Sequence, residues 1–154
     1  MTEAGPQTVR VVALHIAPAR GAPLTAVDRI DVEAGSGVVG DRYYGSTHRH
    51  ISVQSATSLA SAAAALGRPL GPESTRRTVT VSHGDIPTVP GSRMRLGDVQ
   101  VEVVRIAAPC RVMDQINGPG ARRALHGRGG SVCRVLTSGS ISLDDAAWTA
   151  DTTG

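Results

Sequence analysis

Short alternating strands that end at glycine or proline are the feature that most limits the fold of this chain. The pattern is clearest at 99–106, where Val99, Val101 and Val103 supply one apolar face of a strand. Gly97-Asp98 predicts a tight turn that joins this strand to another at 93–96. Further strands or extended segments are predicted at 9–16, 27–32, 48–53, 77–81 and 132–136. Many short strands with frequent glycine turns predict a mainly-β fold, a closed β-barrel with one prominent helix and short helical insertions.

One segment is strongly helical, whereas most of the chain favours strands and turns. Residues 56–66 are rich in alanine, Ser55 can accept a hydrogen bond as the N-cap, and Gly67 predicts the end of the helix. A second, short helix is predicted at 118–125, where it opens with Gly-Pro-Gly. A glycine-rich loop is predicted at 35–41.

The 154 residues correspond in length to one domain. We expect a folded region at 9–148 between disordered tails at 1–8 and 149–154. Two cysteines do not make a disulfide framework, which favours a reducing compartment. The first residues lack the apolar core of a signal peptide, and no segment is apolar enough to span a membrane, so we expect a cytoplasmic protein with no membrane partner.

All 16 basic residues are arginine, because the sequence contains no lysine. Lysine-bound pyridoxal phosphate and a phosphate-binding P-loop are therefore excluded. Phenylalanine is also absent, and the aromatic residues are Tyr43, Tyr44 and Trp148. So few stacking platforms argue against a nucleic acid partner despite a net charge of +3. Arginine is instead suited to bind the phosphate or carboxylate of a small ligand through paired hydrogen bonds.

Cys110 is the candidate reactive residue, since it follows the 99–106 strand directly after Pro109. Proline ends the strand ladder, so the thiol should lie at the mouth of the barrel, just before a turn rich in glycine and proline. Arginines at 105, 111, 122 and 123 are near it in sequence, and positive charge favours a reactive thiolate. A small buried hydrophobic residue at a strand end is an equally open interpretation. Cys133, within the predicted 132–136 strand, is interpreted as a packing residue.

Two histidines offer another use for this cysteine. His48 and His50 are two apart on the predicted 48–53 strand, so their side chains should point the same way. Together with Cys110 they suggest a zinc site, although nothing in the sequence fixes the remaining ligands. A serine hydrolase is not indicated, because no nucleophile-elbow sequence is present.

Several short motifs occur in one order along the chain. They are Gly40 to Gly45, Thr75 to Val79, Met94 to Val99, Pro109-Cys110, Gly118 to Gly120 and the stretch from Gly127 to Leu136. In this order and spacing the chain resembles the MOSC domain, a family named for the C-terminal region of molybdenum cofactor sulfurases. The resemblance extends from about Val9 to Asp145, so the region expected at 9–148 is interpreted as a MOSC domain.

The resemblance implies a barrel-like domain that binds the molybdopterin form of the molybdenum cofactor. The family's cysteine falls on Cys110, which would carry sulfur as a persulfide or bind molybdenum as a thiolate ligand. Arg76 and Arg77 match a basic pair of the family and are candidates to bind the cofactor's phosphate, with Arg128 as the next candidate. The alternative interpretation is that Arg76 and Arg77 are ordinary solvated charges without a ligand. Asp41 would orient a ligand or an arginine, or form an Asx turn.

One residue departs from the family pattern, since many members have a histidine where this chain has Tyr43. Two classes of function follow from the resemblance. The first is a molybdenum-cofactor-dependent protein that transfers sulfur or reduces N-oxygenated compounds. The alternative is a non-catalytic module that binds the cofactor or delivers it to a partner enzyme. Because the sequence contains no electron-transfer motif, the first class requires a separate electron-transfer protein or sulfur donor as partner.

Overall fold

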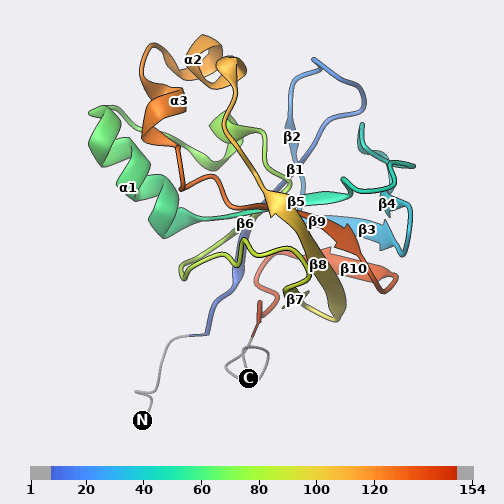
Figure 1. The fold of residues 1–154 in the computed structure, drawn as a ribbon. Coiled ribbons are helices and arrows are strands. Elements are labelled where there is room, and N and C mark those ends of the chain that lie inside the picture. The colour runs from blue at the N-terminus through green and yellow to red at the C-terminus, as the bar shows by residue number, and fades with distance from the viewer. Residues whose placement is uncertain (1–7, 149–154) are drawn as a thin grey trace.

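A curled sheet of seven strands forms the main layer of the molecule, and a second sheet of three strands packs against it (Figure 1). The computed structural model describes residues 8–148, so the expected tails lie outside the described residues, apart from Thr8. The strands are β1 (Val11–Ile16), β2 (Thr25–Ala26), β3 (Arg29–Glu33), β4 (Gly37–Val38), β5 (Ile51–Ser55), β6 (Val79–Val81), β7 (Arg93–Leu96), β8 (Val99–Ile106), β9 (Ser131–Val135) and β10 (Gly139–Ser142). Their order is β2-β1-β6-β5-β9-β8-β7 in the larger sheet and β10-β3-β4 in the smaller one.

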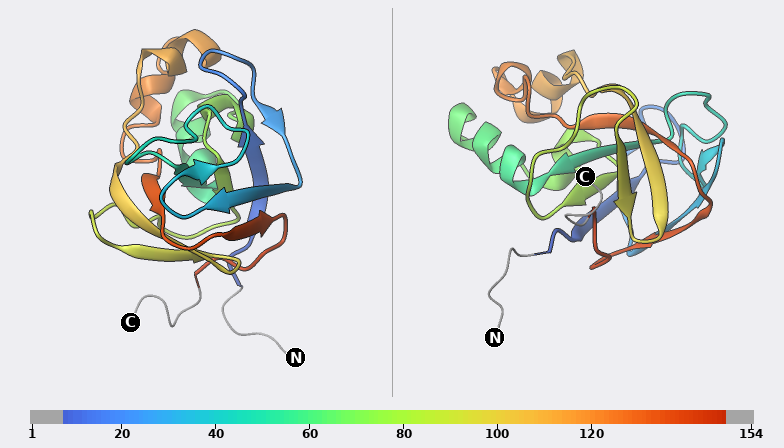
Figure 2. Two further views of the ribbon diagram at one scale, coloured as in Figure 1. Left: turned by 90° about the vertical axis from the view of Figure 1, so that its right-hand side faces the viewer. Right: turned by 60° about the horizontal axis from the view of Figure 1, so that its bottom comes forward.

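The larger sheet curls into a half-barrel whose gap is bridged by one short segment near the end of the described chain. Arg10, just before β1, pairs with Ala146, and Leu96 of β7 pairs with Ala147. The start of β1 and the edge strand β7 are thereby connected through the backbone of 146–147, and Figure 2 shows the resulting curvature. The mainly-β, barrel-like fold predicted from the sequence is confirmed.

Local signals predicted three elements with their correct bounds, namely α1 (Ala56–Leu66), β7 and β8. The Oγ of Ser55 accepts a hydrogen bond from the backbone N–H of Ser58 at 3.1 Å, so Ser55 is the N-cap. Gly67 adopts the left-handed conformation with φ of 80° and ends the helix, as expected.

The largest departure from the prediction is α2 (Arg111–Asn117), which follows Cys110 directly where a turn was expected. Three more short elements depend on distant partners. The strands β2 and β4 have two residues each, β4 lies inside the predicted glycine-rich loop, and β10 pairs with β3 from far along the chain.

Other elements differ from the prediction only in their bounds or are short additions. The strand expected from residue 48 begins at Ile51, and the strand expected from residue 77 begins at Val79. The short helix predicted at 118–125 is α3 (Ala121–Ala124), and a 3-10 helix, η1 (Pro72–Thr75), precedes β6.

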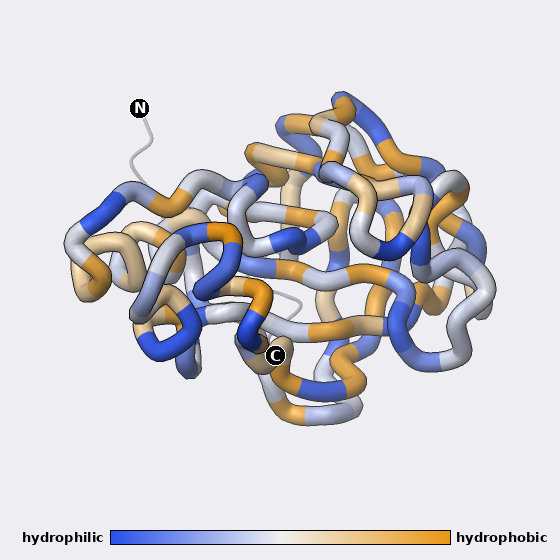
Figure 3. The backbone as a smooth tube through the Cα atoms, turned by 90° about the horizontal axis from the view of Figure 1, so that it is seen from above, coloured by the Kyte–Doolittle hydropathy of each residue, from blue (hydrophilic) through white to orange (hydrophobic). Residues whose placement is uncertain are grey.

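The interior contains two hydrophobic clusters. The larger lies within the curled sheet and includes the inward-facing valines of β8 together with Ile30 and Ile141 of the smaller sheet. The smaller lies among the three α-helices, where Leu59, Met113 and Leu125 are buried. Short hydrophobic stretches alternate with hydrophilic ones along the chain (Figure 3). Within residues 8–148, no helix combines the length and apolar character that crossing a membrane requires.

Candidate functional site

Cys110 lies where the longest strand of the sheet gives way to the helices. The strand β8 ends at Ile106, and the chain then passes through Ala107 to Pro109 before α2 starts (Figure 1). Cys110 occupies the N-cap position of α2 with an extended backbone and is exposed. Cys133 is buried in β9, and this burial raises the pKa of its thiol to about 12. The structure therefore exposes one thiol and buries the other.

Arg77 holds the loop that carries Cys110. Its side chain is buried, its Nε donates to the carbonyl of Gly129 at 3.0 Å, and its Nη2 donates to the carbonyl of Ala107 at 3.3 Å. The pKa of Arg77 is lowered to about 10, mainly by burial and also by the charge of Arg49, while Cys110 acts in the opposite direction. Arg77 is therefore an electrostatic neighbour of both Cys110 and Arg49, and two of its donors are engaged by the protein itself.

The glycines near residue 130 are needed because three backbone segments meet there. The backbone N–H of Ala107 donates to the carbonyl of Gly130 at 2.9 Å. A Cβ at Gly130 would lie 1.7 Å from the carbonyl oxygen of Val53, and one at Gly129 would lie 2.6 Å from the carbonyl oxygen of Ala107. These glycines thus allow the 129–130 backbone to lie close to both β5 and the loop that leads to Cys110.

Five arginines line one cavity of about 630 Å³, which we call the arginine pocket. They come from four separate parts of the chain: the loop after β1, the loop between β4 and β5, the residue after η1, and β8. The lining residues are Arg20, Gly21, Arg42, Tyr43, Tyr44, Ser46, Arg49, Arg76 and Arg105. None of these described lining residues is acidic, so the cavity suits an anion.

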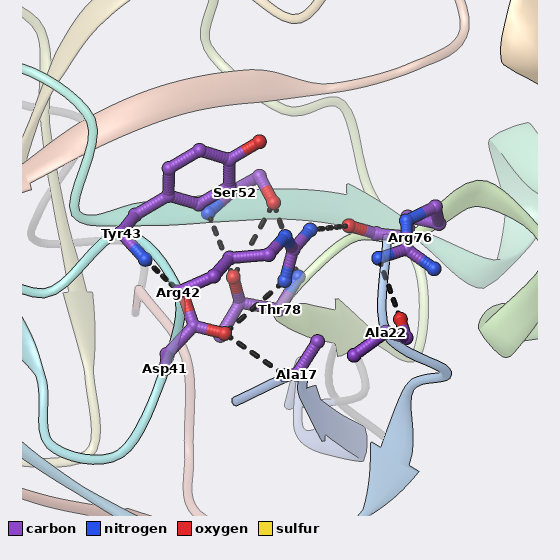
Figure 4. A network of polar contacts seen from close by, with 8 residues as sticks. All are labelled: Ala17, Ala22, Asp41, Arg42, Tyr43, Ser52, Arg76 and Thr78. Carbon is purple, nitrogen blue, oxygen red and sulfur yellow. Dashed lines mark hydrogen bonds and ion pairs between the residues drawn. The ribbon is translucent and has the colours of Figure 1, made fainter. Parts of the chain in front are cut away.

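Asp41 sits behind the arginine pocket and orients one of its arginines (Figure 4). Its Oδ1 accepts hydrogen bonds from the backbone N–H of Ala17 at 3.0 Å and from Nη1 of Arg42 at 3.1 Å. Its Oδ2 accepts from the backbone N–H of Tyr43 at 3.3 Å, which is the contact of an Asx turn. Both roles considered for Asp41 from the sequence, orienting an arginine and forming a turn, are present.

Tyr43 stacks with two arginines of the pocket. The Cζ atom of Arg42 lies 4.6 Å from the ring centroid, and that of Arg49 lies 4.3 Å from it. Burial lowers the pKa of Arg49, and Arg105, Arg42 and Arg20 lower it further by repulsion. The Nε of Arg49 is buried and has no hydrogen-bond partner among the described residues. An unpaired donor of this kind, amid like charges, fits a bound anion.

Arg76 reaches the same cavity through an unusual backbone conformation. It is one of two described non-glycine residues with positive φ, at 59°, and its Nη2 donates to the carbonyl of Ala22 at 3.0 Å. Its own carbonyl accepts a hydrogen bond from Nη2 of Arg42 at 3.2 Å (Figure 4). Left-handed backbone in a residue with a long side chain costs energy and is concentrated at functional sites.

The structure separates the two arginines that the sequence paired, and it separates Arg128 from both. Arg76 lines the arginine pocket, whereas Arg77 is buried beside the Cys110 loop. Arg128 donates from Nη1 to the carbonyl of Ala124 at 2.9 Å and lines a different, smaller cavity next to α1.

The histidine pair does not form a metal site with Cys110. Both histidines precede β5, so the expected alignment on one strand is wrong. His50 is buried, its Nδ1 accepts from the backbone N–H of Val135 at 2.9 Å, and its Nε2 lies 2.7 Å from the carbonyl oxygen of Ser46. In the part of the chain that the structure describes, no group of three or more histidine, cysteine or acidic side chains could hold a metal ion.

Sequence reasoning missed most of the pocket. Arg20, Arg42 and Arg49 were not singled out, and Arg105 was considered only as a neighbour of Cys110 in sequence. A weak signal existed in the arginine that follows Gly40-Asp41 and in the use of arginine for every basic residue. The convergence of the four segments depends on the fold, which a local motif does not report.

The half-barrel, with a cysteine on the loop after β8 and an arginine-lined cavity, defines a class of mainly-β domain. A sequence model of the MOSC domain matches residues 40–147, and the chain belongs to the MOSC domain family. No curated protein sequence matches the chain.

Solved structures share the fold. The chain is similar to the YuaD protein of Bacillus subtilis, with a TM-score of 0.83, 21% identity, and coverage of 92% of this chain and 94% of that one. It is also similar to YiiM from Geobacillus stearothermophilus, with a TM-score of 0.71, 15% identity, and coverage of 91% and 74%. YiiM from Escherichia coli gives a TM-score of 0.67 and 15% identity, with coverage of 90% and 68%.

Proposed function

We propose that this protein binds the molybdenum cofactor, with the cofactor's phosphate in the arginine pocket and Cys110 as the sulfur carrier or the protein ligand to molybdenum. The MOSC family is linked to this cofactor. The observation that carries the proposal is the cavity lined by five arginines, among them Arg49, whose buried Nε has no hydrogen-bond partner among the described residues. A phosphate monoester would provide the missing acceptor and offset the repulsion among these guanidinium groups.

The residues present fit the cofactor's two ends. Arg49 and Arg76 are the side chains best suited to hold the phosphate, because both line the cavity and Arg49 has an unused donor. Asp41 and Tyr43 keep Arg42 in place, so the pocket is preorganised before an anion enters. Arg77 is an electrostatic neighbour of both Arg49 and Cys110, which supports binding of one elongated ligand by the pocket and the thiol together.

Cys110 supplies the soft ligand that this assignment requires. Molybdenum, when bound, supplies two-electron redox chemistry at a centre that thiolate sulfur stabilises. The exposed thiol lies on a loop held by Arg77 and by the backbone contact from Ala107 to Gly130. An exposed, well-held sulfur suits transfer to or from a partner as well as metal ligation.

The test measures molybdenum and pterin in protein purified from a molybdenum-replete host. The Arg49→Gln/Arg76→Gln variant should retain at least tenfold less of both, since each charge-assisted hydrogen bond to phosphate contributes about 1.5–3 kcal/mol. The matched control is Arg93→Gln/Arg95→Gln, which removes two exposed arginines of β7 that lie outside the arginine pocket.

Cys110→Ser separates binding from chemistry. It should retain pterin through the phosphate while losing sulfur transfer or the protein's own ligand to molybdenum. Circular dichroism establishes that each variant is folded. Full retention of pterin by a folded Arg49→Gln/Arg76→Gln protein, or the same loss in the β7 control, would refute the assignment of the arginine pocket.

The exposure of Cys110 favours the non-catalytic module as the second candidate. A delivery protein releases its cofactor readily, whereas an enzyme retains it through many turnovers. Repeated gel filtration of loaded protein distinguishes the two candidates. Loss of most of the pterin within one passage supports delivery, and retention supports a resident cofactor.

A further inference from the structure

A second cavity lies on the helical side of Cys110 and is not used by the proposed phosphate site. It has a volume of about 760 Å³ and is called here the α2–α3 pocket. Its lining residues are Ala108, Pro109, Asp114, Gly120, Arg122, Arg123 and His126. It shares no lining residue with the arginine pocket. Two of its wall residues, Ala108 and Pro109, directly precede Cys110, so the pocket adjoins the loop that carries the exposed thiol.

The polar groups of this pocket are available to a ligand. Within residues 8–148, the side chains of Arg122, Arg123 and His126 make no hydrogen bond or ion pair with the protein, and all three residues are exposed. The carboxylate of Asp114 is engaged, since its Oδ1 accepts a hydrogen bond from the backbone N–H of Arg122 at 2.8 Å. The pocket therefore presents two free guanidinium groups and an imidazole, which together favour an anion.

The rest of the pocket's lining, apart from Asp114, is apolar. Ala108, Pro109 and Gly120 offer no charged or hydroxyl side-chain group. A ligand that contacts both kinds of lining residue has an anionic group and an apolar body. The volume is sufficient for a small organic molecule, whereas inorganic phosphate would leave the apolar wall without a partner.

We propose that the α2–α3 pocket binds a small organic anion, a carboxylate or phosphate attached to an apolar body, and presents it to Cys110. The proposal that this pocket binds a ligand depends only on its lining residues. Its role as the substrate site rests on the proposed function, in which Cys110 carries the sulfur or the metal that reacts. Arg77 and Gly130 hold Ala107, the residue at the start of the loop that carries both the pocket wall and the thiol.

The test uses benzoate, phenol and inorganic phosphate as probes, with the full chain and isothermal titration calorimetry. We expect benzoate to bind at least tenfold more tightly than phenol, which lacks the anionic group. Inorganic phosphate reports on the arginine pocket instead. The Arg122→Gln/Arg123→Gln variant should bind the organic anion about tenfold more weakly or worse, since two charge-assisted contacts are lost. Arg93→Gln/Arg95→Gln, which removes two exposed arginines of β7 outside both pockets, should bind it as the parent does.

Protection of the thiol locates the bound probe. Saturating benzoate should slow alkylation of Cys110 by neutral iodoacetamide severalfold in the parent, and this protection should be absent in Arg122→Gln/Arg123→Gln. No binding of benzoate, binding of phenol equal to that of benzoate, or unchanged affinity for benzoate in a folded Arg122→Gln/Arg123→Gln protein would overturn the proposal. These measurements need no molybdenum, so failure of the cofactor assignment, measured as pterin retention, is a separate result.

Discussion

Substitution of Gly130 by alanine should damage the fold far more than the same change at Gly127. Both glycines belong to one motif and both have positive φ, 83° and 74° respectively. An added Cβ at Gly127 meets nothing within 4 Å, whereas at Gly130 it would lie 1.7 Å from the carbonyl oxygen of Val53 and 2.8 Å from its carbonyl carbon. Comparison of the two alanine variants therefore separates the cost of steric overlap with the backbone, present only at Gly130, from the cost of left-handed conformation, present at both.

The expected magnitudes differ clearly. Left-handed backbone costs an alanine about 1–2 kcal/mol, partly offset by the lower entropy of the unfolded chain, so Gly127→Ala should lose about 1 kcal/mol. At Gly130 the backbone must also move by more than 1 Å, which disrupts the pairing of Val53 with Ser131 and the hydrogen bond from Ala107. Unpaired buried backbone groups cost about 1–3 kcal/mol each, so Gly130→Ala should lose about 4 kcal/mol or more.

Urea unfolding followed by fluorescence measures both variants, because Trp148 is the single tryptophan and packs against the main core. The loss expected for Gly130→Ala is a large fraction of the free energy of unfolding of a typical domain, which is roughly 5–15 kcal/mol. In thermal unfolding, Gly127→Ala should shift the midpoint by about 2–4 °C and Gly130→Ala by about 10 °C or more. Equal stability of the two variants would refute the reasoning that close backbone contact, rather than φ, explains Gly130.

Three further predictions concern the thiols, a buried histidine and a helix cap. At neutral pH Cys110 should be alkylated at least tenfold faster than Cys133, because Cys133 is buried with a raised pKa; mass-spectrometric mapping decides this, and equal labelling would contradict it. Burial lowers the pKa of His50 below its ordinary 6.5, so the unfolded chain takes up the proton first and the free energy of unfolding should fall below pH 6.5. Urea titrations at successive pH values measure this fall, which should be smaller in His50→Gln. Ser55→Ala should cost about 1 kcal/mol by the same assay, and no change would remove the cap assignment.

Elements with strong local signals could be predicted from the sequence. The alternation of β8 and the cap residues of α1 act within a few residues, so their bounds follow from local chemistry. The helix α2 was missed because its seven residues lie between Pro109-Cys110 and Gly118-Pro119-Gly120, which are turn signals. The strand β10 was missed because it starts at a glycine and is stabilised by β3, a partner far away in sequence.

The candidate site was predictable in its chemistry but not in its assembly. Cys110 and Asp41 could be identified because proline and glycine mark their surroundings. The different positions of Arg76 and Arg77 could not be predicted. Arg76 has a positive φ and lines the arginine pocket, whereas Arg77, the next residue, is buried. Convergence of arginines from four segments is a property of the tertiary structure, which composition alone does not report.

The arginine pocket also makes the stability of this protein depend on the anions in its buffer. Repulsion among Arg49, Arg105, Arg42 and Arg20 opposes folding, because the unfolded chain places these charges far apart. Any anion that binds the assembled pocket shifts the folding equilibrium by mass action, by about 2.7 kcal/mol at a concentration of 100 times its Kd. The buffer anion therefore acts as a folding ligand, and melting temperatures measured in phosphate and in a zwitterionic buffer describe two different equilibria of the same chain.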